Sequence, residues 1–131
     1  EHLARQKLAD LFLDTFNVNA HTTTSDALWA GVPVLTKLGE GFAARVAGSL
    51  LRAVGLPELV TETEEHYEAL ALKLATNPKL LTKIKSKLAK NRLTQPLFNA
   101  EQYTSYLETG YKMAYARYLN GDSPEHIYVS K

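Results

Sequence analysis

Short hydrophobic runs in the first half of the chain predict strands, and helix-like stretches separate them. Residues 9–15 predict a buried strand, residues 33–36 a second one rich in Val and Leu, and residues 59–60 a last short strand. Predicted helices lie between them, at residues 22–30 and 42–54. This order of strand and helix is typical of parallel β-α units. The pattern therefore predicts an α/β fold with a parallel sheet.

Apolar stripes on the predicted helices indicate which faces are buried. In the helix at residues 42–54 the stripe recurs every four positions, and we expect it to face the core: Phe42, Val46, Leu50 and Val54. The second half of the chain is predicted to be helical over residues 63–75, 78–91 and 101–119. The last of these carries a Tyr-rich stripe, which is typical of core packing: Tyr103, Leu107, Tyr111, Ala114 and Tyr118. A helical C-terminal end is thus expected.

Composition limits the function without choosing it. The 131 residues suit one domain or part of a larger one, and 45% hydrophobic residues are enough for a core. A formal net charge of +1 gives no reason to expect a nucleic-acid partner, and the absence of Cys excludes disulfides and thiolate chemistry. Without a transmembrane-length run or a signal peptide, we expect no membrane partner and an intracellular, cytoplasmic location, or a nuclear one in a eukaryote. The missing initial Met predicts a piece of a longer protein.

The most informative polar cluster follows the first predicted strand. His21, Thr22 and Thr23 stand at the predicted helix start, and Asp26 lies one turn further on. A helix start presents free N–H groups and the positive end of the helix dipole, so it favours an anion such as phosphate. The hydroxyls and the imidazole add donors, whereas Asp26 repels phosphate but can accept hydrogen bonds from a ribose. The arrangement predicts a site for a sugar-nucleotide diphosphate.

Each of these residues also has a structural interpretation. His21 could be a satisfied structural His, the two threonines could be N-caps, and Asp26 could favour the helix dipole alone. Capping and phosphate binding are compatible. His66 and His126 lack metal-ligand spacing, so no metal site is predicted.

Three further residues are assigned no role in binding. Asp10 and Asp14 flank the first predicted strand and do not form a convincing acid/base pair. Trp29 is expected to lie in the core, where it would pack the short helix on the sheet.

The sequence resembles the protein O-linked N-acetylglucosamine (O-GlcNAc) transferases, in which tetratricopeptide repeats are fused to a GT-B catalytic region of two Rossmann-like domains. The resemblance runs from Glu1 to about Tyr118, and the shared order and spacing of its motifs make it specific. The matching residues are His21-Thr22-Thr23, Asp26 and Leu28 to Pro33; Glu1-His2 and Leu8-Ala9-Asp10; Leu13-Asp14-Thr15 and Asn19; Gly39-Glu40 and Ala44 to Ala47; and Pro96 to Asn99 with Gln102-Tyr103.

This resemblance implies a C-terminal portion of a Rossmann-like GT-B nucleotide-binding domain. Residues 1–93 would be the UDP-binding portion, residues 94–120 a C-terminal loop and long helix, and residues 121–131 a tail. The family transfers N-acetylglucosamine from UDP-GlcNAc to Ser or Thr of proteins, with inversion and without a metal ion or other cofactor. Repeats upstream would bind the protein acceptors.

Site residues follow from the same resemblance, position by position. Thr22 and Thr23 would meet the diphosphate, with His21 at the same turn, and Asp26 would hold the ribose hydroxyls. His2 would contact the nucleotide from a neighbouring loop. The family's diphosphate Lys and its general-base candidates lie upstream, so no catalytic residue is expected in this chain, which would be inactive alone.

Three other interpretations stay open. A GT-B transferase could use another UDP-sugar, such as UDP-glucose, or another acceptor, because the sugar is read partly by the other half of the site. A degenerate, non-catalytic interaction domain is a second alternative, against which the intact residues His21, Thr22, Thr23 and Asp26 argue. A dehydrogenase-type domain is a third, but the glycine fingerprint G-x-G-x-x-G follows none of the predicted strands.

Overall fold

The computed structural model describes residues 1–129 as two compact units, residues 1–98 and residues 99 onward. The first unit contains a parallel sheet of strands β1 (Phe12–Leu13), β2 (Val34–Lys37) and β3 (Val60–Thr61), in the order β1-β2-β3. The α/β fold with parallel strands is therefore confirmed. Strand register pairs Phe12 with Val34 and Leu13 with Leu35, then Thr36 with Val60 and Lys37 with Thr61.

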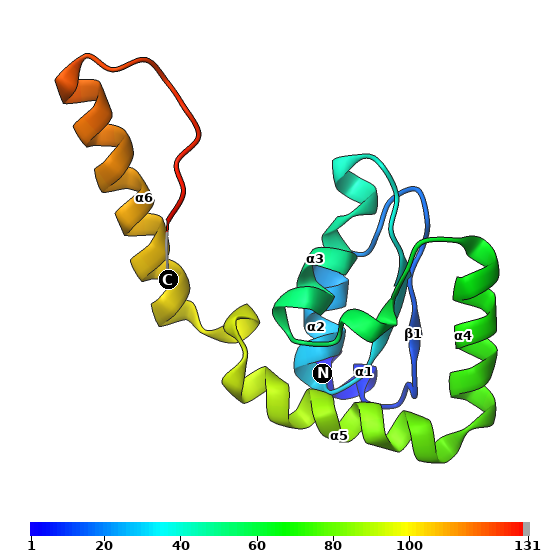
Figure 1. The fold of residues 1–131 in the computed structure, drawn as a ribbon. Coiled ribbons are helices and arrows are strands. Elements are labelled where there is room, and N and C mark those ends of the chain that lie inside the picture. Colours follow the sequence, from blue (N-terminus) through cyan, green and yellow to red (C-terminus); the bar gives the residue numbers. More distant parts are fainter. Residues whose placement is uncertain (130–131) are drawn as a thin grey trace. The chain divides into compact units, whose positions relative to one another are not determined.

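Helices cover both faces of this sheet (Figure 1). Helices α2 (Thr22–Ala30) and α3 (Val46–Ala53) lie on one side of the strands, and α4 (Glu64–Thr76) lies on the other. Helix α5 (Pro78–Thr94) passes the amino ends of the strands, where the Lys85 Nζ lies 2.6 Å from Asp10 Oδ1. The carboxyl ends of the strands are thus left to loops, which is where open α/β sheets bind ligands.

Local sequence signals set the ends of these helices. Thr63 caps α4 by accepting from the His66 N–H at 3.1 Å, and Asn77 caps α5 by accepting from the Leu80 N–H at 3.0 Å. Gly31 ends α2 in the left-handed conformation, with φ +91°. Short 3₁₀ turns occupy three of the connections: Phe42–Ala44, Pro57–Leu59 and Pro96–Phe98.

The hydrophobic core lies between the sheet and these helices. Helices α2, α3, α4 and α5 each contribute a fully buried leucine, and Leu56 and Leu59 add two more from the turn before β3. Each such side chain stabilises the fold by about 1.5–3 kcal/mol through apolar burial. The helices predicted at residues 63–75 and 78–91 contribute Leu74, Ile84 and Leu88 to this core, and Leu70 and Leu80 pack against it. The core cluster consists of Ala27, Leu28, Val32, Val34, Leu51, Val54, Leu56, Leu59, Leu74, Ile84 and Leu88.

The helix predicted at residues 42–54 is wrong in its continuity and partly wrong in its buried face. A 3₁₀ turn over Phe42–Ala44 precedes α3, and Arg45 between them has non-helical angles of φ −123° and ψ −10°. Phe42 is 83% exposed, whereas Val54 is buried as predicted and Leu50 packs against the core. The other buried positions are small residues or follow a stripe position by one: Ala44, Ala47, Gly48 and Leu51. Close helix-sheet contact selects small residues, and a Cβ on Gly48 would lie 2.7 Å from Leu38 Cδ1.

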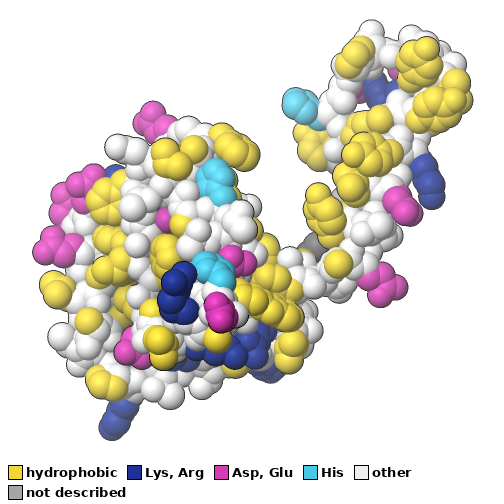
Figure 2. Space-filling view, turned by 180° about the vertical axis from the view of Figure 1, so that it is seen from behind, with side chains coloured by type: hydrophobic (Ala, Val, Ile, Leu, Met, Phe, Trp, Pro, Cys, Tyr) yellow, Lys and Arg dark blue, Asp and Glu magenta, His cyan; other side chains and the backbone are white. Residues whose placement is uncertain are grey.

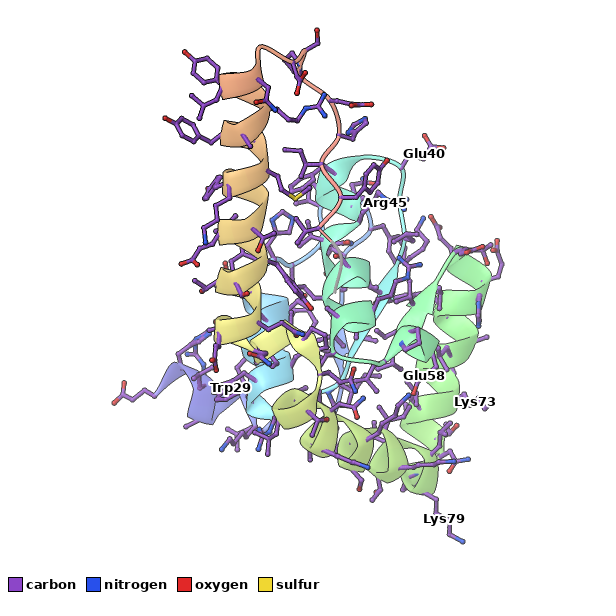
Figure 3. All side chains as sticks on the ribbon, turned by 60° about the vertical axis from the view of Figure 1, so that its left-hand side comes forward. Trp29, Glu40, Arg45, Glu58, Lys73 and Lys79 are labelled. Atoms are coloured by element: carbon purple, nitrogen blue, oxygen red, sulfur yellow. The ribbon has the colours of Figure 1, made fainter. Side chains whose placement is uncertain are left out.

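Two other burial predictions are also wrong. The first strand is only two residues long, and Leu13 is 54% exposed because β1 pairs with β2 alone among the described residues. Trp29 is 45% exposed and packs at the surface against Phe98, with a ring-centroid distance of 5.1 Å. Figure 3 shows Trp29 on the outer side of α2. The Arg92 Nη1 donates to the Trp29 carbonyl at 2.6 Å and so tethers α5 to the end of α2.

The second unit contains helix α6 (Ala100–Asn120) and the residues that follow it. Asn99 caps this helix by accepting from the Gln102 N–H at 3.0 Å. Its Tyr-rich stripe is exposed rather than buried, and apolar side chains are visible along the helix (Figure 2). The prediction of a core stripe is therefore wrong among the described residues. The residues after α6 contact Arg117, whose Nη2 donates to the Ser123 carbonyl at 2.8 Å and lies 3.0 Å from Glu125 Oε2.

Candidate nucleotide-diphosphate site

The start of α2 forms an open donor-rich surface at the carboxyl end of the sheet. His21 is the N-cap of α2, Thr22 and Thr23 form its first turn, and all three are exposed. The first bond back into the helix runs from the Ser25 N–H to the His21 carbonyl at 3.2 Å. The backbone N–H groups of the first turn, before Ser25, have no intrahelical acceptor. They therefore face outward at the positive end of the helix dipole. An anion fits this chemistry.

Asp26 and His2 meet beside this surface, although they are 24 residues apart in the sequence. The His2 Nε2 lies 3.2 Å from Asp26 Oδ2, and the two side chains are 53% and 34% exposed. Helix α1 (His2–Gln6) packs against α2 and presents His2 there. Asp26 follows Thr22 by four positions and therefore shares its helix face. The structure thus brings all five predicted site residues into one region, and histidine and acidic side chains lie together on this side of the first unit (Figure 2).

A second loop holds the imidazole of His21. The Ala43 carbonyl accepts from the Asn19 N–H at 2.8 Å and lies 3.3 Å from His21 Nε2. A carbonyl can only accept, so this contact is a hydrogen bond when Nε2 carries the proton. The Phe42 ring also meets the His21 ring edge-on, with centroids 6.2 Å apart. These contacts fix the orientation of the imidazole relative to the helix start.

Arg45 and Gly39 shape this second loop. The Arg45 Nη1 donates to the Gly39 carbonyl at 2.9 Å, so the guanidinium is used at least in part to close the loop. The Gly39 N–H donates to the Ala44 carbonyl at 2.8 Å. Figure 3 shows Glu40 extending away from the ribbon at the same end of the unit.

Substitution of Gly39 by Ala should disturb the loop. Its Cβ would lie 2.5 Å from Ala44 Cβ, so the backbone must move. We expect Gly39→Ala to lower the free energy of unfolding by about 1–3 kcal/mol, as for overpacked positions. Gly41→Ala is the matched control, because a Cβ there meets nothing within 4 Å. Urea unfolding of both variants checks this, and equal stabilities would contradict the packing argument.

Asn19 was missed as a structural part of the site. Its side chain is buried, and both of its polar atoms are used: Nδ2 donates to the Thr15 carbonyl at 2.9 Å and Oδ1 accepts from the Ala47 N–H at 3.3 Å. Ala47 lies in the first turn of α3. Asn19 therefore caps α3 from another loop, and the sequence signal for it was only its place in the family motif.

Asp14 was also missed, because the sequence analysis gave it no role beyond its place in the family motif and rejected it as half of an acid/base pair. It is 4% exposed at the carboxyl end of β1. Its Oδ1 accepts from the Ala20 N–H at 2.7 Å and its Oδ2 accepts from the Thr36 hydroxyl at 2.6 Å. The signal in the sequence was a charged residue directly after an apolar run, where ligand-binding loops of parallel sheets begin.

Tyr67 lies against the backbone of the same residue. Its hydroxyl donates to the Asp14 carbonyl at 2.9 Å, and its ring meets Phe16 edge-on at 5.0 Å. Burial raises the pKa of Tyr67, and the negative charge of Asp14 raises it further. Both causes disfavour the phenolate in the folded state.

A pH dependence of stability follows from this raised pKa. The stabilising contribution is complete below the ordinary tyrosine value of 10.0 and is lost as the pH rises through the folded-state value. Between about pH 9 and about pH 11, the free energy of unfolding should fall more steeply for the unsubstituted protein than for Tyr67→Phe. Tyr103→Phe, at a position that is 67% exposed, is the control and should leave the slope unchanged. Urea unfolding across this range measures it, and identical slopes for all three proteins would contradict it.

The described residues offer neither a metal-ion cluster nor a membrane-spanning helix. Within residues 1–129 there is no group of three or more His, Cys, Asp or Glu side chains arranged to hold a metal ion. Over the same residues, each helix is too short or too polar to cross a membrane.

Comparison with known protein families decides what this geometry belongs to. The model of glycosyl transferase family 41 matches residues 1–107. The chain belongs to this family. This membership confirms the predicted resemblance. The matched residues include the parallel sheet and the donor-rich start of α2.

Individual relatives agree with this assignment. The chain is similar to a probable UDP-N-acetylglucosamine–peptide N-acetylglucosaminyltransferase of Arabidopsis thaliana. The two are 42% identical over 130 residues, which cover 98% of this chain and 13% of that protein. A Caenorhabditis elegans UDP-N-acetylglucosamine–peptide N-acetylglucosaminyltransferase is 39% identical over 127 residues, covering 97% of this chain and 11% of that protein.

A solved structure resembles the fold as well as the sequence. A mutant of the Thermobaculum terrenum O-GlcNAc transferase matches with a TM-score of 0.69 and 36% identity, over 80% of this chain and 21% of that one. The chain thus spans about an eighth of the curated relatives and a fifth of the solved structure.

Proposed function

We propose that this chain is the UDP-binding part of an inverting glycosyltransferase that moves N-acetylglucosamine from UDP-GlcNAc to Ser or Thr of proteins. The observation that carries this proposal is the meeting of the open α2 start with the His2–Asp26 pair, 3.2 Å apart, on one face of the unit. A diphosphate needs donors, a ribose needs an acceptor, and both are present side by side. The activities for which the relatives are named supply the sugar and the acceptor class.

Each residue has a role in this proposal. Thr22 and Thr23 bind the diphosphate through their N–H and hydroxyl groups, and His21 adds a donor from the same turn. Asp26 accepts from the ribose hydroxyls. His2 contacts the nucleotide from α1, and its imidazole keeps Asp26 in place when the site is empty, as their 3.2 Å separation indicates.

The proposed chemistry assigns this region to the leaving group. Negative charge grows on the UDP diphosphate as its bond to the sugar breaks, and preorganised donors lower the energy of that state. We propose that the reaction needs no metal or other cofactor, so these N–H, hydroxyl and imidazole groups would share the task with cations from elsewhere in the protein. No catalytic base is assigned to this chain.

The proposal also covers partners and location. Protein acceptors would bind through tetratricopeptide repeats in the same polypeptide, and no nucleic acid or membrane would be involved. The proposed location is intracellular, in the cytoplasm, or in the nucleus of a eukaryote. A related transferase with another UDP-sugar or acceptor, and a degenerate interaction domain, are the two outcomes that the experiment must separate from it.

Transfer assays test the proposal directly. The protein, expressed from its complete reading frame, is incubated with protein acceptors and with UDP-GlcNAc, UDP-glucose or UDP-galactose, and modified Ser and Thr are located by mass spectrometry. Transfer from UDP-GlcNAc that Asp26→Ala weakens and Asp10→Ala does not is the expected result. Preferred transfer from another donor would replace the sugar in the proposal. UDP binding without any transfer would indicate the interaction domain.

A further inference from the structure

Asp14 is a buried acid whose two side-chain oxygens join the sheet to the beginning of α2. Its side chain is 4% exposed. One oxygen accepts from the backbone of Ala20, the residue before the His21 N-cap, and the other accepts from Thr36 on β2. The distances of 2.7 and 2.6 Å are those of charge-assisted hydrogen bonds.

The backbone of Asp14 is also hydrogen-bonded on both sides. Its N–H donates to the Leu35 carbonyl at 3.0 Å, and its carbonyl accepts from the Tyr67 hydroxyl at 2.9 Å. Asp14 is therefore anchored to β2 and to α4 before it reaches the loop. Between Asp14 and Ala20 the chain is largely exposed, at Thr15, Asn17 and Val18.

The charge of Asp14 argues for a geometric role. A carboxylate behind an anion-binding loop opposes a diphosphate electrostatically, and burying it carries a desolvation cost. What Asp14 supplies instead is a fixed position for the Ala20 peptide. That peptide determines where the His21 ring and the first N–H groups of α2 point.

We propose that Asp14 is a positioning residue that holds the α2 start in the geometry that binds the nucleotide diphosphate. This inference rests on the proposed function of that surface. Asp14 touches neither the nucleotide nor the sugar; it acts through Ala20. Without this tether the loop populates other conformations, and the apparent affinity falls by the fraction that stays competent.

Substitutions of Asp14 provide a graded test. In the protein expressed from its complete reading frame, Asp14→Ala should weaken UDP binding by about tenfold, and Asp14→Asn should weaken it less, because its amide oxygen still accepts from Ala20. Thr36→Val removes one donor to the carboxylate and should cause an intermediate loss of UDP affinity. It keeps the proposal testable if Asp14→Ala fails to fold. Titration calorimetry measures the Kd, and thermal unfolding measures Tm.

The matched control is Asn91→Ala, which removes part-buried hydrogen bonds far from the loop that Asp14 tethers. The Asn91 Nδ2 donates to the carbonyls of Val54 and Gly55 at 3.0 and 3.2 Å. It should lower Tm and leave the Kd for UDP unchanged. If the Asp14 and Thr36 variants also lower Tm without changing the Kd, Asp14 is merely structural and the proposal is overturned.

Amide hydrogen exchange separates this proposal from the proposed function. Ala20 should exchange faster in Asp14→Ala and in Thr36→Val than in Asn91→Ala, whether or not UDP binds. A wild-type protein that does not bind UDP would contradict the proposed function, and the Asp14 proposal would then be judged on this exchange alone. Equal exchange in all variants would overturn it.

Discussion

Asp26→Ala should weaken UDP binding by about ten- to a hundredfold. Hydrogen bonds to a charged acceptor contribute about 1.5–3 kcal/mol, and Asp26 is the acceptor that the account assigns to the ribose. Isothermal titration of the protein from its complete reading frame with UDP measures the change. The effect is expected on affinity with little change in Tm, because the Asp26 side chain is 34% exposed and pairs only with His2 in the described structure.

Two controls isolate the ribose contribution. Asp10→Ala removes another acid, 84% exposed and ion-paired with Lys85 at the opposite end of β1, and should leave UDP affinity unchanged. A UDP analogue without both ribose hydroxyls should bind the wild type and Asp26→Ala equally. If the analogue and UDP lose the same affinity on substitution of Asp26, then Asp26 does not read the ribose.

Leu28→Ala should lower the free energy of unfolding by about 2–5 kcal/mol, the range for leucine truncation in well-packed cores. Leu28 is 0% exposed and joins α2, the helix that carries the site, to the central core cluster. Urea unfolding monitored by circular dichroism measures the change. A loss of this size is a large share of the stability of a small domain.

Leu93→Ala is the control for this prediction. Leu93 is 73% exposed on α5, so its truncation should change the unfolding free energy by less than about 0.5 kcal/mol. Similar losses for both variants would mean that α2 does not pack as described. A changed slope with denaturant for Leu28→Ala would instead indicate a loss of two-state unfolding.

Local chemistry explains why the candidate site was visible in the sequence. A helix start needs only a few neighbouring residues, so His21, Thr22 and Thr23 after an apolar run indicate a donor-rich turn without knowledge of the fold. The caps at Thr63 and Asn77 and the stop at Gly31 are equally local. The position of His2 is different, because its contact with Asp26 depends on how α1 packs on α2. The family resemblance alone indicated that His2 belongs to the site, and its contact with Asp26 was not predicted.

Tertiary packing explains what the sequence did not reveal. Apolar size favoured Phe42 as a core residue, but the sheet accepts α3 through the small residues Ala47 and Gly48. The place of Asp14 directly after an apolar run was a local signal, but its hydrogen-bonding role was not, because one of its partners, Thr36, lies 22 residues away. Hydrogen-bonded buried acids are defined by such distant partners, so a pattern of nearby residues does not identify them.

The central claim is that the α2 start binds the diphosphate of a uridine nucleotide. It is tested most directly by titrating the isotope-labelled protein with UDP and with ADP while the amide resonances are followed. The account predicts shifts concentrated at residues 21–26 and at His2 with UDP, and weaker shifts with ADP. A protein from the complete reading frame that is folded and shows no shift at these residues up to millimolar UDP would contradict it.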